Sequence, residues 1–185
     1  MTINHFKITD VLTNKSKNGF TLIEALVAIA ILLIVVVAPI SLIGDSLHKL
    51  WYARDEALSV NLAQEGIEMV RQVRDSNMLS GSPWLTNLAD GTYKVDVANF
   101  TAGGAPSTVV IPCPSCGPLQ PLYLNASGIY EQGTVATPTR FWRIVTISSA
   151  GLPANERQVT STVTWQTSGS TGTVSASEYI FSWAV

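Results

Sequence analysis

The feature that most constrains this chain is an uncharged apolar run from Ala25 to Gly44. A helix needs about 20 apolar residues to cross the hydrocarbon core of a bilayer. Because backbone groups in lipid must bond to one another, the run predicts a membrane-spanning helix. One acid, Glu24, lies directly before it. A carboxylate inside a membrane costs roughly 2.5–3.5 kcal/mol on insertion scales, so Glu24 needs a partner or a function.

A secretory signal is a first alternative for this N-terminus. Such a signal joins a basic start, a short apolar core and a cut site of small residues. The run here is longer than that, and the sequence after Gly44 has no Ala-x-Ala-like site and continues in helical rhythm. An uncut signal anchor that only tethers a domain remains as the alternative.

The segment 19–25, Gly-Phe-Thr-Leu-Ile-Glu-Ala, closely resembles the cleavage and methylation motif of type IV prepilins and type II secretion pseudopilins. In that family a membrane peptidase cuts after the glycine and then N-methylates the new terminus. The resemblance implies that residues 1–19 are a leader, that prepilin peptidase/methyltransferase cleaves between Gly19 and Phe20, and that Phe20 becomes N-methylated. Lys15 and Lys17 suit retention of the leader on the cytoplasmic face.

The resemblance also implies a role for Glu24 in assembly. Once Phe20 is the terminus its amine is a second buried charge, and buried charges of opposite sign are tolerable only when paired. Within one helix the two groups lie about a turn apart, so Glu24 of one subunit pairs better with the Phe20 amine of a neighbour and sets the axial register. A compatible local role exists, because Thr21 to Glu24 has the form of a capping box and an acid suits the positive end of a helix.

The helix is expected to continue from Asp45 to Asn77, where there is no proline and only one glycine, Gly66. Apolar residues recur there at three- and four-residue spacing, which predicts one stripe that lies on a domain. On the opposite, exposed side, pairing at four-residue spacing is expected between Asp45 and Lys49 and between Arg71 and Asp75. The stripe consists of Leu47, Leu50, Trp51, Leu58, Leu62, Met69, Val70 and Val73.

Pro39 interrupts the apolar run. Proline removes a backbone hydrogen bond and clashes with the preceding turn, so a kink or local melting is expected between Val35 and Pro39. In the pilin family a proline here accompanies a curved helix that loses hydrogen bonding in the filament. A simple membrane-helix kink is the alternative.

Beyond Ser76 the pattern changes to short segments with alternating polarity, separated by glycine and proline. This pattern predicts antiparallel strands. Val159, Val163 and Trp165 are expected to face a core, and Tyr179, Phe181 and Trp183 are expected to pack against the helix rather than to form a ligand platform. The predicted strands are Thr92 to Val97, Thr108 to Ile111, Leu122 to Leu124, Arg140 to Ser148, Arg157 to Gln166 and Val174 to Trp183.

Together these elements predict an α+β, pilin-like fold. Its expected parts are a leader at 1–19, a transmembrane and assembly helix at 20–44, an amphipathic helix at 45–77 and an antiparallel β-sheet domain at 78–185. The helix segment 58–71 resembles that of minor pilins and minor pseudopilins. So does the sequence 141–144 followed by the strand at 163–165, which favours a minor subunit.

Cys113 and Cys116 are the other chemical signal. Zinc needs four ligands, and the only histidines are His5 in the leader and His48 beside the membrane, so no metal is expected. A redox pair of the thioredoxin kind needs a helix start after a strand, which flanking Pro112 and Gly117 do not offer. A structural disulfide is expected in an extracytoplasmic domain, with a reduced pair as the alternative.

No enzyme is predicted. No histidine follows His48, which excludes Ser-His-Asp and Cys-His catalysis in the exported domain. Three lysines and one aspartate precede Phe20, so the cleaved chain keeps 8 basic and 12 acidic residues. This balance gives no basic footprint for nucleic acid.

The sequence therefore predicts a structural subunit, minor in type, of a type IV pilus or type II secretion pseudopilus. Its expected location is the inner (cytoplasmic) membrane, crossed once, with the C-terminal domain extracytoplasmic, and later the fibre. The partners implied are prepilin peptidase, other subunits, the inner-membrane assembly platform and the lipid bilayer, with no cofactor. The alternative is a membrane-anchored extracytoplasmic binding domain that does not polymerise.

Overall fold

The structure is a computed structural model that describes residues 19–101, 105–116, 121–132, 137–167 and 169–183. The predicted leader up to residue 18 lies outside the described residues. The chain divides into two compact units, Met1–Asp45 and Ser46–Val185, and each is considered by itself.

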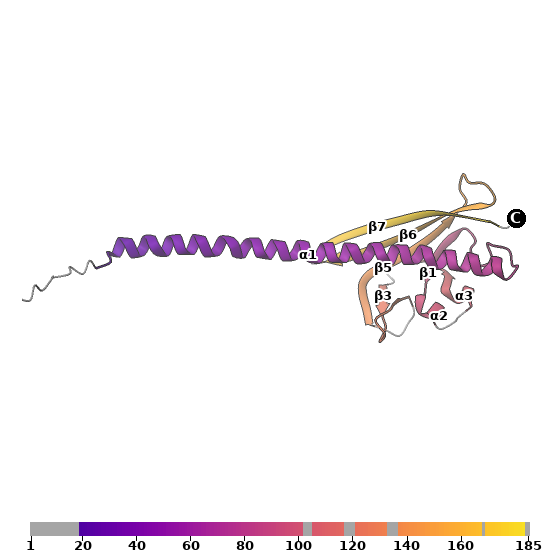
Figure 1. Cartoon of the computed structure of the whole chain (residues 1–185), viewed down its shortest axis with the longest axis horizontal. Helices are drawn as coiled ribbons and strands as arrows, with labels where there is room; N and C mark the ends of the chain where they lie inside the picture. Colours follow the sequence, from indigo (N-terminus) through magenta and orange to yellow (C-terminus); the bar gives the residue numbers. More distant parts are fainter. Residues whose placement is uncertain (1–18, 102–104, 117–120, 133–136, 168, 184–185) are drawn as a thin grey trace, which may run out of the picture. The chain divides into compact units, whose positions relative to one another are not determined.

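One long helix, α1, runs from Leu22 to Leu79 and is the first element in Figure 1. Its most apolar 18-residue window has a mean hydropathy of 3.2, so α1 is long and apolar enough to cross a membrane. The helix continues through Pro39. The kink expected at that residue stays a prediction.

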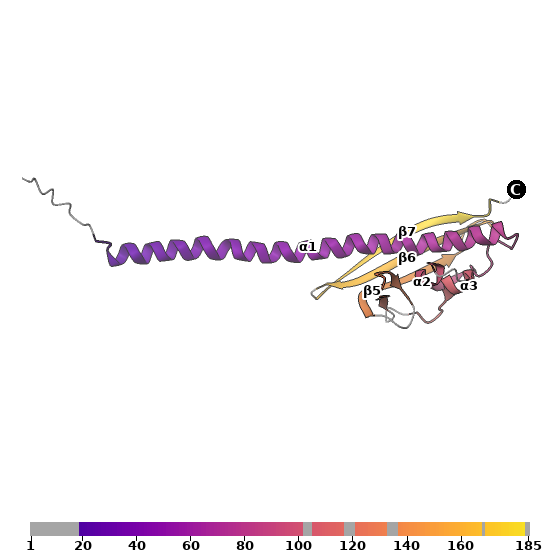
Figure 2. The ribbon, with the colours of Figure 1, turned by 60° about the horizontal axis from the view of Figure 1, so that its bottom comes forward.

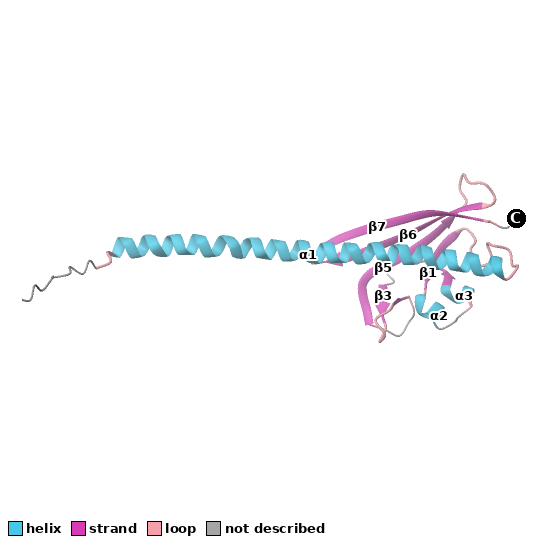
Figure 3. Ribbon diagram, viewed as in Figure 1, coloured by secondary structure: helices cyan, strands magenta, loops and turns pink. Residues whose placement is uncertain are grey.

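Among the residues that the structure describes, seven strands form one antiparallel sheet after the helix. Figure 3 shows this helix and sheet, which confirm the predicted α+β class. The long strands β5, β6 and β7 are near their predicted positions. The two-residue strand β4 was missed, because alternation cannot be read in so short a segment. The strands are β1 (Gly91–Val95), β2 (Val110–Pro112), β3 (Pro121–Leu124), β4 (Tyr130–Glu131), β5 (Thr137–Ser148), β6 (Glu156–Thr167) and β7 (Ser170–Phe181).

Strand β5 organises the sheet. Along one edge its last residues pair with β1 and its first residues pair with β3. Along the other edge it pairs with β6, which in turn pairs with β7 over the full length of both strands. The smaller strands β2 and β4 extend the first edge, next to β1 and β3.

Within the second unit, the later part of α1 lies across one face of the sheet (Figures 1 and 2). The predicted stripe is buried there from Leu62 onwards, and its buried members are Leu62, Met69, Val70 and Val73. On the sheet, Val159, Val163 and Trp165 face this helix and are buried, as alternation predicts.

Gly66 allows the helix to approach the sheet closely. A Cβ atom at this position would lie 2.5 Å from Ser161 Oγ and 3.1 Å from Val145 Cγ2. Ser161 and Val145 belong to β6 and β5, so the one glycine inside the amphipathic segment lies where helix and sheet are nearest. The glycine is required by packing, despite its cost to helix propensity.

Arg143 of β5 is fully buried between helix and sheet. Its guanidinium donates to the carbonyl oxygen of Leu62 at 3.0 Å, to Glu65 Oε2 at 2.7 Å and to the carbonyl oxygen of Val95 at 2.8 Å. Burial lowers the pKa of Arg143, and the charge of Glu65 opposes that change. Arg143 thus joins α1, β5 and β1 through one side chain. The local sequence around Arg143, between Trp142 and Ile144, did not predict that this arginine is buried and bound to other elements.

The first part of the predicted stripe does not pack on the sheet. Leu47, Leu50 and Trp51 are 46%, 62% and 50% exposed, contrary to the prediction. Tyr52 is the first aromatic residue of this segment to reach the sheet, with its ring centroid 5.6 Å from that of Trp165. Strand β6 ends at Thr167, two residues after Trp165, so the sheet ends close to where Tyr52 meets it and leaves Leu47, Leu50 and Trp51 exposed.

The expectation for the aromatic residues of β7 was also wrong. Tyr179, Phe181 and Trp183 are each about half exposed, and Ile180 is buried instead. The register with β6 explains this, since Tyr179 lies opposite Gln158 on the outer face. The three aromatic side chains do share one face of β7, but that face is the exposed one and not the one that packs on the helix.

Two short helices replace predicted strand residues. Helix α2 (Val97–Thr101) follows β1, and Asp96 caps it by accepting the amide of Ala98 at 3.2 Å. Helix α3 (Pro106–Val109) takes the first part of the strand that was predicted to start at Thr108. A proline at the first helical position favours such a turn.

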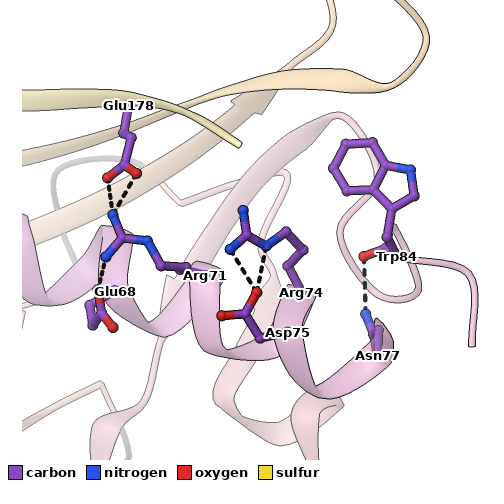
Figure 4. A network of polar contacts seen from close by, with 7 residues as sticks. All are labelled: Glu68, Arg71, Arg74, Asp75, Asn77, Trp84 and Glu178. Atoms are coloured by element: carbon purple, nitrogen blue, oxygen red, sulfur yellow. Dashed lines mark hydrogen bonds and ion pairs between the residues drawn. The ribbon is translucent and has the colours of Figure 1, made fainter. Parts of the chain in front are cut away.

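Arg71 does not pair with Asp75 as predicted. It is bound by Glu68 on its own helix and by both carboxylate oxygens of Glu178 on β7, as Figure 4 shows. The hydrogen bond that Arg71 donates to Glu178 is the main reason that the pKa of Arg71 is raised. Asp75 is bound by Arg74 instead, at 2.6 Å. Tertiary contact with β7 therefore overrides the local spacing.

Candidate functional site: the N-terminal segment

The start of α1 is held by local capping. Thr21 Oγ1 accepts the backbone N–H of Glu24 at 3.3 Å, and the Thr21 carbonyl oxygen accepts the N–H of Ala25 at 3.1 Å. Thr21 is thus the N-cap and Glu24 occupies the third helical position. Gly19 and Phe20 precede the helix. The hydrogen bond to Thr21 Oγ1 agrees with the capping by Thr21 that the sequence predicted, whereas the role of the Glu24 carboxylate stays a prediction.

Phe20 and Glu24 lie on one shallow groove of the helix surface. The groove has a volume of about 440 Å³, and Phe20 is 77% exposed. Its positions recur at three- and four-residue spacing, so they form one face of the helix. The groove is lined by Phe20, Ile23, Glu24, Val27, Ala28 and Ile31.

The helix around this groove exposes its large apolar side chains on every side. Between Leu22 and Ile43 each such residue is at least 48% exposed. A helix that is hydrophobic all round is stable only in lipid or among other helices. The segment therefore has the character of a membrane anchor or of a helix that packs with copies of itself.

Cys113 and Cys116 form a disulfide, with their Cα atoms 5.3 Å apart. The backbone amide of Cys113 donates to the carbonyl oxygen of Thr92 at 2.8 Å, which fixes the loop to β1. The sequence left open whether these thiols are oxidised. Among the residues that the structure describes, no three His, Cys, Asp or Glu side chains are grouped to hold a metal ion.

Sequence reasoning missed the buried polar residues that link the elements of this domain. Asp55 is buried and accepts hydrogen bonds from Arg140 Nη2 at 2.8 Å and from the Thr167 hydroxyl. Gln132 donates to the carbonyl oxygen of Arg143 at 2.9 Å and accepts the amide of Val95 at 2.8 Å. Asp55 links α1 to β5 and β6, and Gln132 links β5 to β1.

Comparison with known proteins adds one finding. Residues 14–38 match a family model described as the prokaryotic N-terminal methylation motif. A search of curated proteins and a search of solved structures returned no significant match. The matched residues contain Gly19, Phe20 and Glu24 together with the first part of the exposed apolar helix. The match shows that the chain carries this methylation motif, and it supports the resemblance to type IV pilins and type II secretion pseudopilins.

Proposed function

We propose that this protein is a structural subunit, minor in type, of a type IV pilus or type II secretion pseudopilus. Prepilin peptidase cleaves it after Gly19 and methylates the new amine of Phe20, and the apolar helix then drives its assembly. The observation that carries this proposal is the methylation motif at the start of a helix whose apolar side chains are exposed on every side.

In this proposal Glu24 pairs with the Phe20 amine of a neighbouring subunit. Both side chains line the same groove, so an incoming helix can meet them together. Two opposite charges taken out of water stabilise an assembly only when they are paired and hydrogen-bonded. Capping by Thr21 uses the backbone N–H of Glu24, which leaves its carboxylate available for such a pair.

Before assembly the subunit is held in the inner membrane, with the apolar run spanning the bilayer and the sheet domain on the extracytoplasmic side. The disulfide between Cys113 and Cys116 supports this side, because disulfides persist outside the cytoplasm. The partners are then the peptidase, sister subunits and the assembly platform of the membrane.

N-terminal sequencing of the membrane-extracted protein tests the processing step. We expect the mature chain to start at N-methylated Phe20. A chain that starts at Met1 in cells with an active prepilin peptidase would contradict the proposal. That result would favour the uncut anchor with a binding domain.

A Glu24→Gln variant tests the assembly step. We expect normal cleavage and membrane insertion but loss of incorporation into fibres, because the buried amine then has no partner. Glu56→Gln, an exposed acid on the same helix, is the matched control and should assemble like the wild type. Normal incorporation of Glu24→Gln, measured in sheared fibre fractions, would remove the pairing role of Glu24.

A further inference from the structure

Three apolar side chains of the second unit have no place in its core. Leu47, Leu50 and Trp51 are exposed although they continue the buried stripe of α1. They follow Gly44, the last residue of the uncharged run, by at most seven positions. Tryptophan is enriched where a membrane meets water. The exposure of these side chains is therefore the expected result for a helix that emerges through the headgroup layer.

A pocket of about 280 Å³ lies beside these residues, wholly within the second unit. It is formed by α1, by the last residue of β6 and by the first residue of β7. The ring of Tyr52 packs against Trp165, so one wall of the pocket is fixed to the sheet. The pocket is lined by His48, Lys49, Tyr52, Thr167 and Ser170.

The charge of this pocket favours an anion. Lys49 forms no ion pair in the described part of the chain. Asp45 lies four positions before Lys49 but is not among the ion pairs of the described residues. Within the described residues, Asp55 accepts a hydrogen bond from the lining residue Thr167, and its carboxylate is buried and also bound by Arg140. Asp55 therefore does not repel an anion at the pocket mouth.

The other groups at the pocket can donate hydrogen bonds. Ser170 and Tyr52 carry hydroxyls, and His48 offers an imidazole N–H. The centroid of the His48 ring lies 6.2 Å from that of Trp51. One ammonium group with several hydroxyl and imidazole donors is the set that a phosphate group needs, since phosphate offers several acceptor oxygens.

We propose that this pocket binds the phosphate of an anionic phospholipid headgroup in the extracytoplasmic leaflet. The short distance along the sequence from the apolar run to the pocket favours a lipid over a free anion. His48 lies four residues after Gly44, which is about 14 Å of fully extended chain at most, so the pocket stays close to the end of the apolar run. The inference rests on the proposed membrane insertion, but on neither cleavage nor polymerisation.

Native mass spectrometry of the full chain, released from detergent micelles that contain equal amounts of dioleoyl phosphatidylglycerol and dioleoyl phosphatidylcholine, tests this site. We expect the protein to retain phosphatidylglycerol about fivefold over phosphatidylcholine, the effect of one lysine near an anionic surface. Lys49→Gln should abolish the preference. Lys94→Gln removes the only other lysine after Gly19 and should keep it.

Ser170→Ala separates a pocket from general surface charge. Ser170 is far from Lys49 in sequence and lines the same cavity, so its loss should lower the preference without any change of charge. Retention of the preference in both Lys49→Gln and Ser170→Ala would overturn the inference. An equal loss in Lys94→Gln would do the same.

Inorganic phosphate in large molar excess is the second arm of the experiment. We expect it to leave the bound phosphatidylglycerol in place, and displacement by phosphate would assign the pocket to a free anion instead of a lipid. N-terminal sequencing of the same sample keeps the two proposals apart. An uncut chain that still prefers phosphatidylglycerol would overturn processing and leave this site intact.

Discussion

The two parts of α1 have the same backbone structure and opposite surroundings. Up to Ile43 the helix exposes its apolar side chains, whereas from Leu62 to Val73 it buries them against a sheet of its own chain. In the proposed function the first part obtains its partners from outside the molecule, from lipid or sister helices. The second part obtains them from the fold. A substitution should therefore affect stability in the second part and assembly in the first.

The largest effect on this comparison is expected from Arg143→Ala. It leaves Glu65 and the carbonyl oxygens of Leu62 and Val95 without their donor, and breaking a buried pair of this kind costs about 3–5 kcal/mol. Denaturant unfolding followed by tryptophan fluorescence measures the loss. The exposed Arg54→Ala is the control and should change little. Equal stability of the two variants would contradict the role of Arg143.

Leucine-to-alanine changes compare the two parts of the helix directly. Leu62→Ala should lower the free energy of unfolding of the sheet domain by about 2–5 kcal/mol, because it opens a cavity in the core. Leu33→Ala, on an exposed position, should leave that free energy unchanged and reduce only incorporation into fibres. A similar loss of stability from both substitutions would remove the distinction.

Glycine-to-alanine changes compare the same two parts of the helix, with a smaller expected effect on the free energy of unfolding. Gly66→Ala should cost about 1–3 kcal/mol through overpacking, because its Cβ would lie 2.5 Å from Ser161 Oγ. Gly44→Ala meets nothing within 4 Å and should be neutral or slightly stabilising. Adding Ser161→Ala to Gly66→Ala should restore part of the loss. Failure of this rescue would show that the contact with Ser161 is not limiting.

The smallest effect is a pH dependence at Asp90. Hydrogen bonds from Ser149 and then the charge of Arg157 lower the pKa of this carboxyl below its ordinary value of 3.8. A lowered pKa in the folded state stabilises the fold above the ordinary value, and this contribution disappears as the pH falls through the folded pKa. The stability difference between wild type and Asp90→Asn, measured from pH 7 downwards, should therefore shrink only below about pH 4.

Local patterns predicted much of this fold. The uncharged run, the capping by Thr21, and the alternation of β6 each depend on neighbours within a few positions, and each was predicted correctly as structure. The short segments were harder. Strand β4 has two residues, and Pro106 starts a helical turn where β-branched neighbours suggested a strand. In such segments the tertiary context outweighs propensity.

The sequence by itself determined the helix that can cross a membrane, the processing motif at its start and the α+β class, because composition and spacing are local properties. Only the tertiary structure decided which side chains are buried. The end of the sheet leaves Leu47 and Trp51 exposed, and the register of β7 turns Tyr179 outward. Arg143 gains its partners from two other elements. These outcomes depend on strand register and on distant partners, which no local pattern records.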